Sequence, residues 1–180
     1  QAGLVFMPKD HCLTHLAGLK AKEVMIDPAT CPHAIARLLG DDAIKGESPI
    51  TIMKARKNHA EQQAIRAVHR RDGAAMAEFL SWFDAASMPG QGLRETDIDA
   101  KLIAIRSQDD LFISPSFSTI CGSGGNGAIV HYRAQHGQDS EILMDTLCLI
   151  DSGGQYQDGT TDITRTVAVG TPSQQMRHHF

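Results

Sequence analysis

The chain has 180 residues, 42% of them hydrophobic, and carries a formal net charge of −4 with a pI near 6.1. This hydrophobic content is sufficient for the core of one domain or slightly more, and the acidic balance argues against a nucleic-acid partner. Because no segment approaches the roughly 18 consecutive apolar residues of a membrane helix, we expect no membrane partner either.

The cysteines and the N-terminus indicate the compartment. Cys12, Cys31, Cys121 and Cys148 show no CxxC spacing and are interpreted as free thiols of a reducing compartment, although the residues alone leave a disulfide open. No signal-peptide pattern follows Gln1. We therefore expect a cytoplasmic protein.

The N-terminal part of the chain predicts a strand over residues 23–27 and a helix over residues 28–39, with a proline suited to the first turn of that helix. Residues 40–49 form a polar connection. We place a domain boundary in this connection, which divides the chain into residues 1–48 and residues 49–180.

Two amphipathic helices are predicted in the middle of the chain. In the first, Gly73 is expected to mark a bend or close packing between two helical segments. Thr96 is the predicted N-cap of the second helix, which runs through Arg106. The apolar positions that recur at three- and four-residue spacing are Ile65, Val68, Ala75, Met76, Phe79, Leu80 and Phe83 in the first helix and Ile98, Leu102, Ile103 and Ile105 in the second.

The C-terminal half predicts short strands or strand approaches over residues 111–119, 128–132 and 141–150. The glycine-rich segment 121–127 could bind a phosphate, but no Lys-Ser/Thr pair follows it and no helix pattern begins there. We therefore interpret it as a loop that enters the strand at residue 128.

Asp151 and Asp162 each lie beside a short apolar or β-branched segment, residues 147–150 before the first and residues 163–169 after the second. A carboxylate at the end of a buried strand is unfavourable unless a cation or several hydrogen-bond donors compensate it. Two such carboxylates at neighbouring places suggest one shared cation or a pair of cations.

The same residues also fit a surface hairpin with Asp158-Gly159 as a two-residue turn. That register would place Asp151 opposite Thr166 and would leave Asp151 and Asp162 four residues out of register, about 13 Å at the rise of a strand. Since this separation is too large for one metal site, metal binding would require a wider or bulged connection, which Gly153-Gly154 would permit. The residues alone leave both interpretations open.

Residues 151–166, DSGGQYQDGTTDITRT, closely resemble the first metal-binding motif of the pita-bread metallopeptidases, and specifically of the long, multidomain Xaa-Pro aminopeptidases (aminopeptidase P). The resemblance implies that Asp151 and Asp162 are ligands of a centre with two divalent metal ions, with manganese (Mn²⁺) the expected metal. Thr164 and Thr166 are candidates to orient these carboxylates because they are close to them in the sequence.

Residues 126–132, NGAIVHY, resemble a family segment whose histidine contacts the substrate near the metals. This implies that His131 binds the substrate and acts as a catalytic residue that helps to stabilise the transition state. Residues 52–58 and 69–82 resemble the entry to the catalytic domain and the helix that follows it. The resemblance is strongest over residues 50–172.

The resemblance implies an α+β fold, in which residues 49–180 are the N-terminal half of a pita-bread catalytic domain. Residues 1–48 would be the C-terminal part of an α/β creatinase-like N-terminal domain. The implied activity is release of the N-terminal residue from peptides with proline at the second position. The expected partners are such peptides and, in the full-length protein, a second copy of the chain in a homodimer.

The family completes its metal centre with a histidine and two glutamates whose counterparts would follow Phe180. His178 and His179 fall in the helix before the family's histidine ligand, and adjacent helix residues point about 100° apart, so we interpret them as partly exposed helix residues. We therefore expect the 180-residue chain alone to be inactive and to bind Mn²⁺ weakly. As half of a domain, it should also be poorly stable or associate through its sheet edges.

Two alternatives stay open. One is another enzyme of the same fold, either a prolidase or a metal-free creatinase. Asp151 and Asp162 argue against a creatinase, and the DGTTDITRT wording of residues 158–166 argues against a prolidase. The other is a non-catalytic pita-bread protein that binds peptides or protein partners, a class that typically lacks the metal-binding aspartates.

Overall fold

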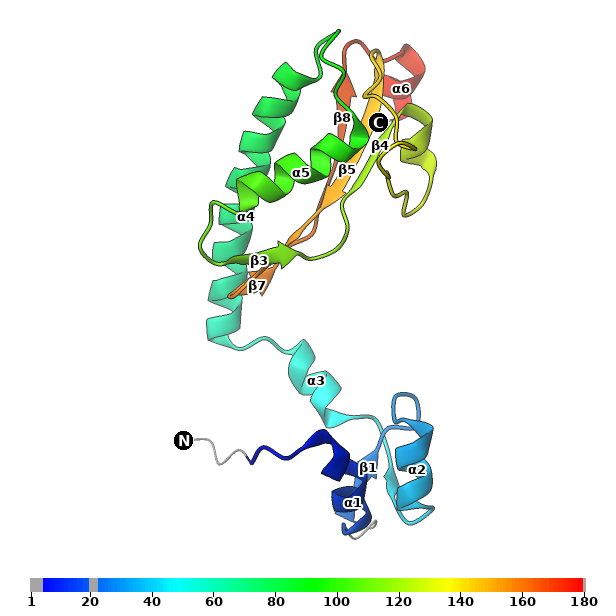
Figure 1. Ribbon diagram of the computed structural model, residues 1–180. Helices are drawn as coiled ribbons and strands as arrows, with labels where there is room; N and C mark the ends of the chain where they lie inside the picture. Colours follow the sequence, from blue (N-terminus) through cyan, green and yellow to red (C-terminus); the bar gives the residue numbers. More distant parts are fainter. Residues whose placement is uncertain (1–4, 20–22, 180) are drawn as a thin grey trace. The chain divides into compact units, whose positions relative to one another are not determined.

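The computed structural model describes residues 5–19 and 23–179 (Figure 1). The chain forms two compact units, residues 1–57 and residues 58–180. In the described part of the chain, no helix is long and apolar enough to cross a membrane.

The first unit is built on a short parallel sheet. Strand β1 (Met25–Ile26) pairs with β2 (Ile44–Lys45), and helix α2 (His33–Leu39) lies between them in the chain. Ile26, Leu39 and Ala43 form its buried core. The remaining elements of this unit are the 3-10 helix η1 (Lys9–His11) and the helices α1 (Cys12–Ala17) and α3 (Pro49–Ala55).

The helix predicted from residue 28 begins only at His33, and this part of the prediction is wrong. Asp27 accepts hydrogen bonds from the backbone N–H of Ala29 at 2.9 Å through its side chain and from that of Cys31 at 2.8 Å through its carbonyl. These bonds stabilise a turn in place of the first helical turn. The helix starts after Pro32, whose own backbone is extended.

The second unit begins with the 28-residue helix α4 (His59–Ala86). Asn58 caps it: its side chain accepts from the N–H of Glu61 at 2.9 Å, and the Glu61 carboxylate accepts from the N–H of Asn58 at 2.8 Å. The predicted apolar face is confirmed, since Val68, Met76, Phe79 and Phe83 are buried. The close packing expected at Gly73 is wrong, because a Cβ there would meet nothing within 4 Å, and the two helical segments are one continuous helix.

Helix α5 (Glu95–Arg106) begins two residues earlier than predicted, because its N-cap is Arg94 and not Thr96. The Thr96 hydroxyl instead donates to the carboxylate of Asp139 at 2.7 Å. The backbone N–H of Arg94, at the N-cap position, donates to the Asp97 carboxylate at 2.8 Å. The Thr96 hydroxyl, which was predicted to cap the helix, therefore makes a tertiary hydrogen bond to Asp139 instead.

The described strands of this unit form two antiparallel three-stranded sheets. The larger one has the order β4-β5-β8, and α4 and α5 pack against it (Figure 1). The smaller one has the order β3-β6-β7. Helices and antiparallel sheets combine as the predicted α+β class requires. The strands are β3 (Phe112–Pro115), β4 (Ile120–Ser123), β5 (Thr146–Ser152), β6 (Gly154–Tyr156), β7 (Gly159–Thr160) and β8 (Ile163–Val169).

The strand predicted over residues 128–132 is wrong. The chain forms the 3-10 helix η3 (Gly124–Ala128) and then a turn. η3 folds back across β4 so closely that a Cβ on Gly122 would lie 2.6 Å from the backbone nitrogen of Gly127. A side chain at position 122 would therefore displace η3. The predicted strands at 111–119 and 141–150 are confirmed only in part, as β3 and residues 146–150 of β5.

All four cysteines are free thiols, as predicted. Cys121 and Cys148 are buried on the paired strands β4 and β5, with their sulfur atoms 3.7 Å apart. The hydrogen bond between the two thiols and their burial raise the pKa of Cys121. This pair is therefore expected to be unreactive while the sheet is folded.

Candidate active site

The register of the hairpin brings Asp151 and Asp162 closer together than a two-residue turn at Asp158-Gly159 would. Tyr156 pairs with Gly159, so the two-residue turn is Gln157-Asp158 and not Asp158-Gly159. In the same register Asp151 lies opposite Thr164. Asp151 and Asp162 are thus two residues out of register, about 7 Å along the strand, and the wider connection that the other register required is unnecessary.

The physical reason for this register is the ion pair that Asp158 forms with Arg71. Its carboxylate accepts two hydrogen bonds from the guanidinium of Arg71 on α4, at 2.7 and 2.9 Å. The Asp109 carboxylate accepts a third from the same guanidinium at 2.7 Å. The hydrogen bonds to Asp158 and then Asp109 raise the pKa of Arg71. An ion pair from another element therefore fixes Asp158 at the second position of the turn.

The hairpin passes from the larger sheet to the smaller one at Gly153, which separates β5 from β6. The Gly153 carbonyl accepts from the N–H of Ser116 at 3.1 Å, and the N–H of Thr161 donates to the carbonyl of Gly154 at 2.9 Å. A Cβ on Gly153 would collide with the Thr161 carbonyl oxygen and the Ser116 hydroxyl. This crossing fixes the position of Asp151 and Asp162 on either side of it.

Gly153→Ala should therefore lower the free energy of unfolding by about 3 kcal/mol or more, because backbone atoms must move to make room. Gly73→Ala is the matched control. A Cβ there meets nothing within 4 Å, and the change should raise stability by about 0.5–1 kcal/mol in a helix interior. Thermal unfolding of both variants measures the two shifts, which should have opposite signs. A Gly153→Ala protein that melts like the wild type would contradict this account of the crossing.

His131, Asp151 and Asp162 all line one pocket of about 380 Å³. They come from three separate segments: the turn after η3, the end of β5 and the residue before β8. The other residues that line this pocket are Phe117, Ser118, Ile120 and Arg133. The structure thus brings together the three residues that the sequence singled out.

The two aspartates differ in their surroundings. Asp151 is half-buried, and one of its oxygens accepts a hydrogen bond from the Thr164 hydroxyl at 2.8 Å. Asp162 is exposed. This direct hydrogen bond supports the proposed role of Thr164 in orienting Asp151.

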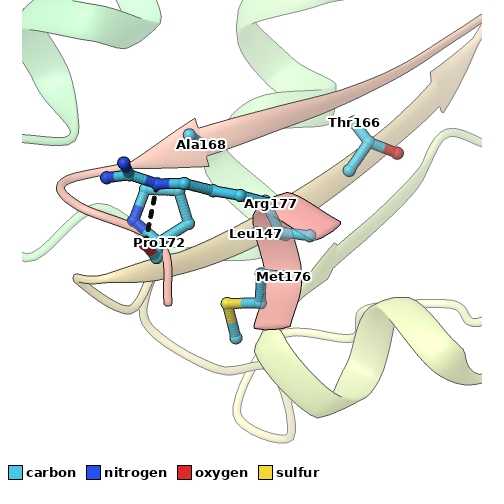
Figure 2. Close-up of a pocket in the computed structure, with 6 residues that line it drawn as sticks. All are labelled: Leu147, Thr166, Ala168, Pro172, Met176 and Arg177. Atoms are coloured by element: carbon cyan, nitrogen blue, oxygen red, sulfur yellow. Dashed lines mark hydrogen bonds between the residues drawn. The ribbon is translucent and has the colours of Figure 1, made fainter. Parts of the chain in front are cut away.

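Thr166 does not share that role. Among the described residues, no hydrogen bond joins it to Asp151 or Asp162, and that part of the hypothesis is not borne out. Thr166 instead lines a different pocket, which is mostly apolar and lies between the β5-β8 pair and helix α6 (Gln174–His179). Figure 2 shows its lining residues, Leu147, Thr166, Ala168, Pro172, Met176 and Arg177.

The backbone at His131 is unusual. Its φ of 56° lies in the left-handed region, which a residue with a Cβ adopts at a cost of about 1–3 kcal/mol. The neighbouring N–H of Tyr132 donates to the carbonyl of Ile129 at 3.1 Å and closes the turn. The His131 side chain is exposed and faces the pocket that contains the two aspartates.

The site offers ligands for a hard or borderline divalent cation, because carboxylate oxygens and imidazole nitrogens suit Mg²⁺, Mn²⁺ and Zn²⁺. Within residues 5–19 and 23–179, no three His, Cys, Asp or Glu side chains lie close enough together to hold a metal ion. Asp151 and Asp162 therefore fit part of a ligand set. His178 and His179 are exposed on α6 and line neither pocket described above, and Phe180 lies outside the described residues.

A buried polar cluster lies on the other side of β5. Arg106 donates to the Asp72 carboxylate at 2.7 Å and to the Ser152 hydroxyl at 3.2 Å, and the Tyr156 hydroxyl donates to Asp72 at 2.7 Å. Burial alone would raise the pKa of Asp72, but the hydrogen bonds from Arg106 and Tyr156 outweigh it and hold that pKa below its ordinary value. Burial and the bond to Asp72 raise the pKa of Tyr156. This cluster joins α4, α5 and β5 just behind Asp151.

Sequence reasoning missed the residue that holds the His131 segment in place, Glu95. It is buried and accepts hydrogen bonds from Asn126 and Tyr132. The signal for it was weak, since Glu95 looks like an ordinary acidic residue at the start of a helix. The two partners lie in the NGAIVHY segment, whose polar residues could have indicated a buried acceptor.

Comparison with known proteins decides the family. Residues 63–180 match metallopeptidase family M24. The chain belongs to metallopeptidase family M24. The match covers the second unit from near the start of α4 to the end of the chain.

The relatives carry one recurrent description. An aminopeptidase P2 of Arabidopsis thaliana is 44% identical over 134 residues, which are 74% of this chain and 19% of that protein. A probable Xaa-Pro aminopeptidase P of Laccaria bicolor is 42% identical over 148 residues, 82% of this chain and 23% of that protein. The chain therefore spans about a fifth of the length of these relatives.

Among solved structures, the chain resembles an X-prolyl aminopeptidase from Caenorhabditis elegans, described as a cytosolic enzyme with a di-nuclear active site. The TM-score is 0.86 at 32% sequence identity, over 96% of this chain and 29% of that one. A prolidase from Pyrococcus horikoshii aligns with a TM-score of 0.68 at 25% identity, over 96% of this chain and 48% of that one. The predicted family and the predicted pita-bread architecture are both confirmed.

Proposed function

We propose that this chain is part of a metal-dependent aminopeptidase that releases the N-terminal residue from peptides with proline at the second position. The family assignment supports a peptidase, and the names of the relatives support this specificity. The observation that carries the proposal is the shared pocket of His131, Asp151 and Asp162.

In this proposal Asp151 and Asp162 contribute to the binding of two divalent cations, with Mn²⁺ the expected metal. Bound there, the cations would supply a water of lowered pKa as a nucleophile near neutral pH. Thr164 holds one oxygen of Asp151 by the 2.8 Å hydrogen bond and so fixes the direction of the other. Asp162, exposed on the same face, is free to meet a cation from the pocket side.

His131 has a different role. Its imidazole lines the wall of the pocket, where it can donate a hydrogen bond to the substrate carbonyl and to the negative charge that develops on its oxygen. The general acid or base of the reaction is not assigned to any residue of this chain.

The test is product analysis with the purified full-length protein, loaded with Mn²⁺ and then stripped with a chelator. Ala-Pro-Ala should release alanine, while Ala-Ala-Ala, the matched peptide without proline, should be cleaved far more slowly. Removal of metal should abolish the activity, and Mn²⁺ should restore it. Cleavage of the dipeptide Ala-Pro in preference to Ala-Pro-Ala would point to a prolidase, and binding without any cleavage to a non-catalytic member.

The activity of the 180-residue chain alone is a separate proposal. Because it contributes two carboxylates and spans about a fifth of its relatives, we expect the isolated chain to be inactive and to bind Mn²⁺ weakly. Isothermal titration with Mn²⁺ and the Ala-Pro-Ala assay measure both properties. Metal-dependent release of alanine by the isolated chain would overturn this expectation.

The same relatives support proposals on domain organisation, cellular location and oligomeric state. We propose that residues 1–48 belong to the end of a creatinase-like N-terminal domain and that residues 49–180 begin the catalytic domain. The four free thiols and the cytosolic relative support a cytoplasmic location. A homodimer of the full-length protein is proposed on the family resemblance, and light scattering would test it.

A further inference from the structure

The side chain of Glu95 is 1% exposed and serves as a hub of hydrogen bonds. One carboxylate oxygen accepts from the N–H of Ser123 at 2.8 Å and from the side-chain amide of Asn126 at 3.0 Å. The other accepts from the hydroxyl of Tyr132 at 2.8 Å and from the N–H of Ser140 at 3.0 Å. Four donors thus converge on one buried carboxylate at the start of α5.

These four donors belong to a single segment of chain, residues 123–140, which carries His131. Ser123 ends β4, Asn126 lies in η3, Tyr132 directly follows His131, and Ser140 is at the far end of the segment. One carboxylate therefore ties both ends and the middle of this segment to α5. The Asn126 amide also lies 3.0 Å from the Tyr132 hydroxyl, so the donors on either side of His131 contact each other.

A second anchor lies beside the first. The guanidinium of Arg94 donates to the Asp139 carboxylate at 3.0 Å and also to the Asp139 carbonyl, and the Thr96 hydroxyl donates to the same carboxylate at 2.7 Å. These hydrogen bonds, from Arg94 first and then Thr96, hold the pKa of Asp139 far below its ordinary value. Asp139 stays ionised, and this end of the segment is held at neutral pH.

The tip of the segment has little packing of its own. Ala128, Ile129, Val130 and His131 are all exposed, yet His131 holds a φ of 56°, which persists only where the surroundings impose it. Asn126 and Tyr132 lie on either side of His131 in this segment, and both donate hydrogen bonds to Glu95. Burial and the bond to Glu95 raise the pKa of Tyr132 to about 12, so its hydroxyl remains a donor across the working pH range.

We propose that Glu95 is a positioning residue for His131. Through Asn126 and Tyr132 it fixes the strained turn that places the imidazole in the pocket with Asp151 and Asp162. This inference rests on the proposed function, in which His131 meets the substrate. It deepens that function by naming the groups that set the geometry of a residue otherwise exposed on a turn.

The test compares two tyrosine variants of the full-length protein. Tyr132→Phe removes the hydroxyl that donates to Glu95, and Tyr156→Phe removes a hydroxyl that donates to another buried carboxylate, Asp72, at 2.7 Å. Tyr132→Phe loses the partly buried hydrogen bond to Glu95 and the contact with the Asn126 amide, and Tyr156→Phe loses one buried hydrogen bond. Both melting temperatures should therefore fall. Tyr132→Phe should lower kcat about tenfold, and Tyr156→Phe should lower it less than twofold. Glu95→Gln should lower kcat about 10- to 100-fold, because a misplacement of a catalytic group by about 1 Å can cost that much.

Two further readouts separate positioning from general stability. Tyr132→Phe and Glu95→Gln should lower kcat by less than twofold when His131 is already replaced by Ala, because the group they position is absent. Hydrogen exchange followed by mass spectrometry should become faster in residues 124–133 of both variants and should stay unchanged there in Tyr156→Phe. Metal content should be unchanged in all three.

The outcomes distinguish this inference from the proposed function. If His131→Ala leaves kcat unchanged, the catalytic role of His131 is wrong, and so is the claim that Glu95 positions a catalytic group. Faster exchange in residues 124–133 would then show only that Glu95 holds the turn. If His131→Ala loses activity while Tyr132→Phe and Glu95→Gln keep it, the positioning claim is overturned and the proposed function stands. Equal losses of kcat in Tyr132→Phe and Tyr156→Phe would also overturn it.

Discussion

Replacement of Asp162 by Asn in the full-length protein should lower kcat/KM on Ala-Pro-Ala by more than about 100-fold. Loss of a group that only orients a metal ligand costs about 10- to 100-fold in affinity or activity, and Asp162 is proposed as a ligand itself. The amide cannot supply the anionic oxygen that a divalent cation prefers. Metal content, measured by plasma mass spectrometry, should fall in parallel with activity.

Asp158→Asn is the matched control for this experiment. Asp158 lies in the same hairpin and carries the same charge, but its carboxylate is bound by Arg71 and does not line the pocket. The asparagine Oδ1 can still accept a hydrogen bond from Arg71 and so keep the turn in place. The replacement should therefore reduce stability slightly and should leave metal content and kcat/KM close to those of the wild type. Equal loss of metal in the two variants would mean that general charge or hairpin stability, and not ligation by Asp162, holds the metal.

Replacement of Arg106 by Met should lower the free energy of unfolding by about 3–5 kcal/mol. Arg106 and Asp72 are 2% and 0% exposed, and removal of one partner leaves a buried charge without its counter-ion. Tyr156 would remain as a donor to Asp72 but carries no charge. Chemical denaturation of the full-length variant, followed through the transition of this unit, measures the loss.

The double variant Arg106→Met with Asp72→Leu distinguishes the loss of the pair from the loss of one partner. Apolar residues of similar volume often replace a buried ion pair at little cost or with a gain. We therefore expect the double variant to recover most of the stability that Arg106→Met loses. A double variant that is less stable than the single one would show that the pair itself contributes a large net stabilisation.

The same pair sets a pH dependence. The pKa of Asp72 is lower in the folded protein than its ordinary value of 3.8. Its contribution to stability is therefore fully present above that ordinary value and is lost as the pH falls through the lower, folded-state pKa. Between pH 5 and pH 8 the contribution should be constant. Acid unfolding curves of the wild type and of the double variant should diverge only below about pH 4.

The elements that the sequence predicted well are those whose pattern is local. The apolar spacing of α4 reports directly which face is buried, and the β-branched segment after Asp162 forms β8 as expected. The DSGGQYQDGTTDITRT wording singled out two aspartates that line the same pocket. These features depend on residues that are close together in the sequence, so the local sequence is enough to predict them.

Two differences from the sequence-based expectations arose where a distant side chain overrides a local preference. Asp158-Gly159 is a favoured turn pair, but Arg71 on α4 binds Asp158 and shifts the turn by one residue. Residues 128–132 have the composition of a strand, but Glu95 draws Asn126 and Tyr132 into a tight turn. In each case a charged partner many residues away decides the backbone, and no local pattern identifies that partner.

The most direct test of the central claim is anomalous diffraction from crystals of the full-length protein loaded with Mn²⁺. We predict anomalous density within coordination distance of the carboxylates of both Asp151 and Asp162, on the side of the pocket that His131 also lines. Anomalous density elsewhere in the protein, with neither carboxylate in contact with it, would contradict the assignment of this pocket as the catalytic metal centre.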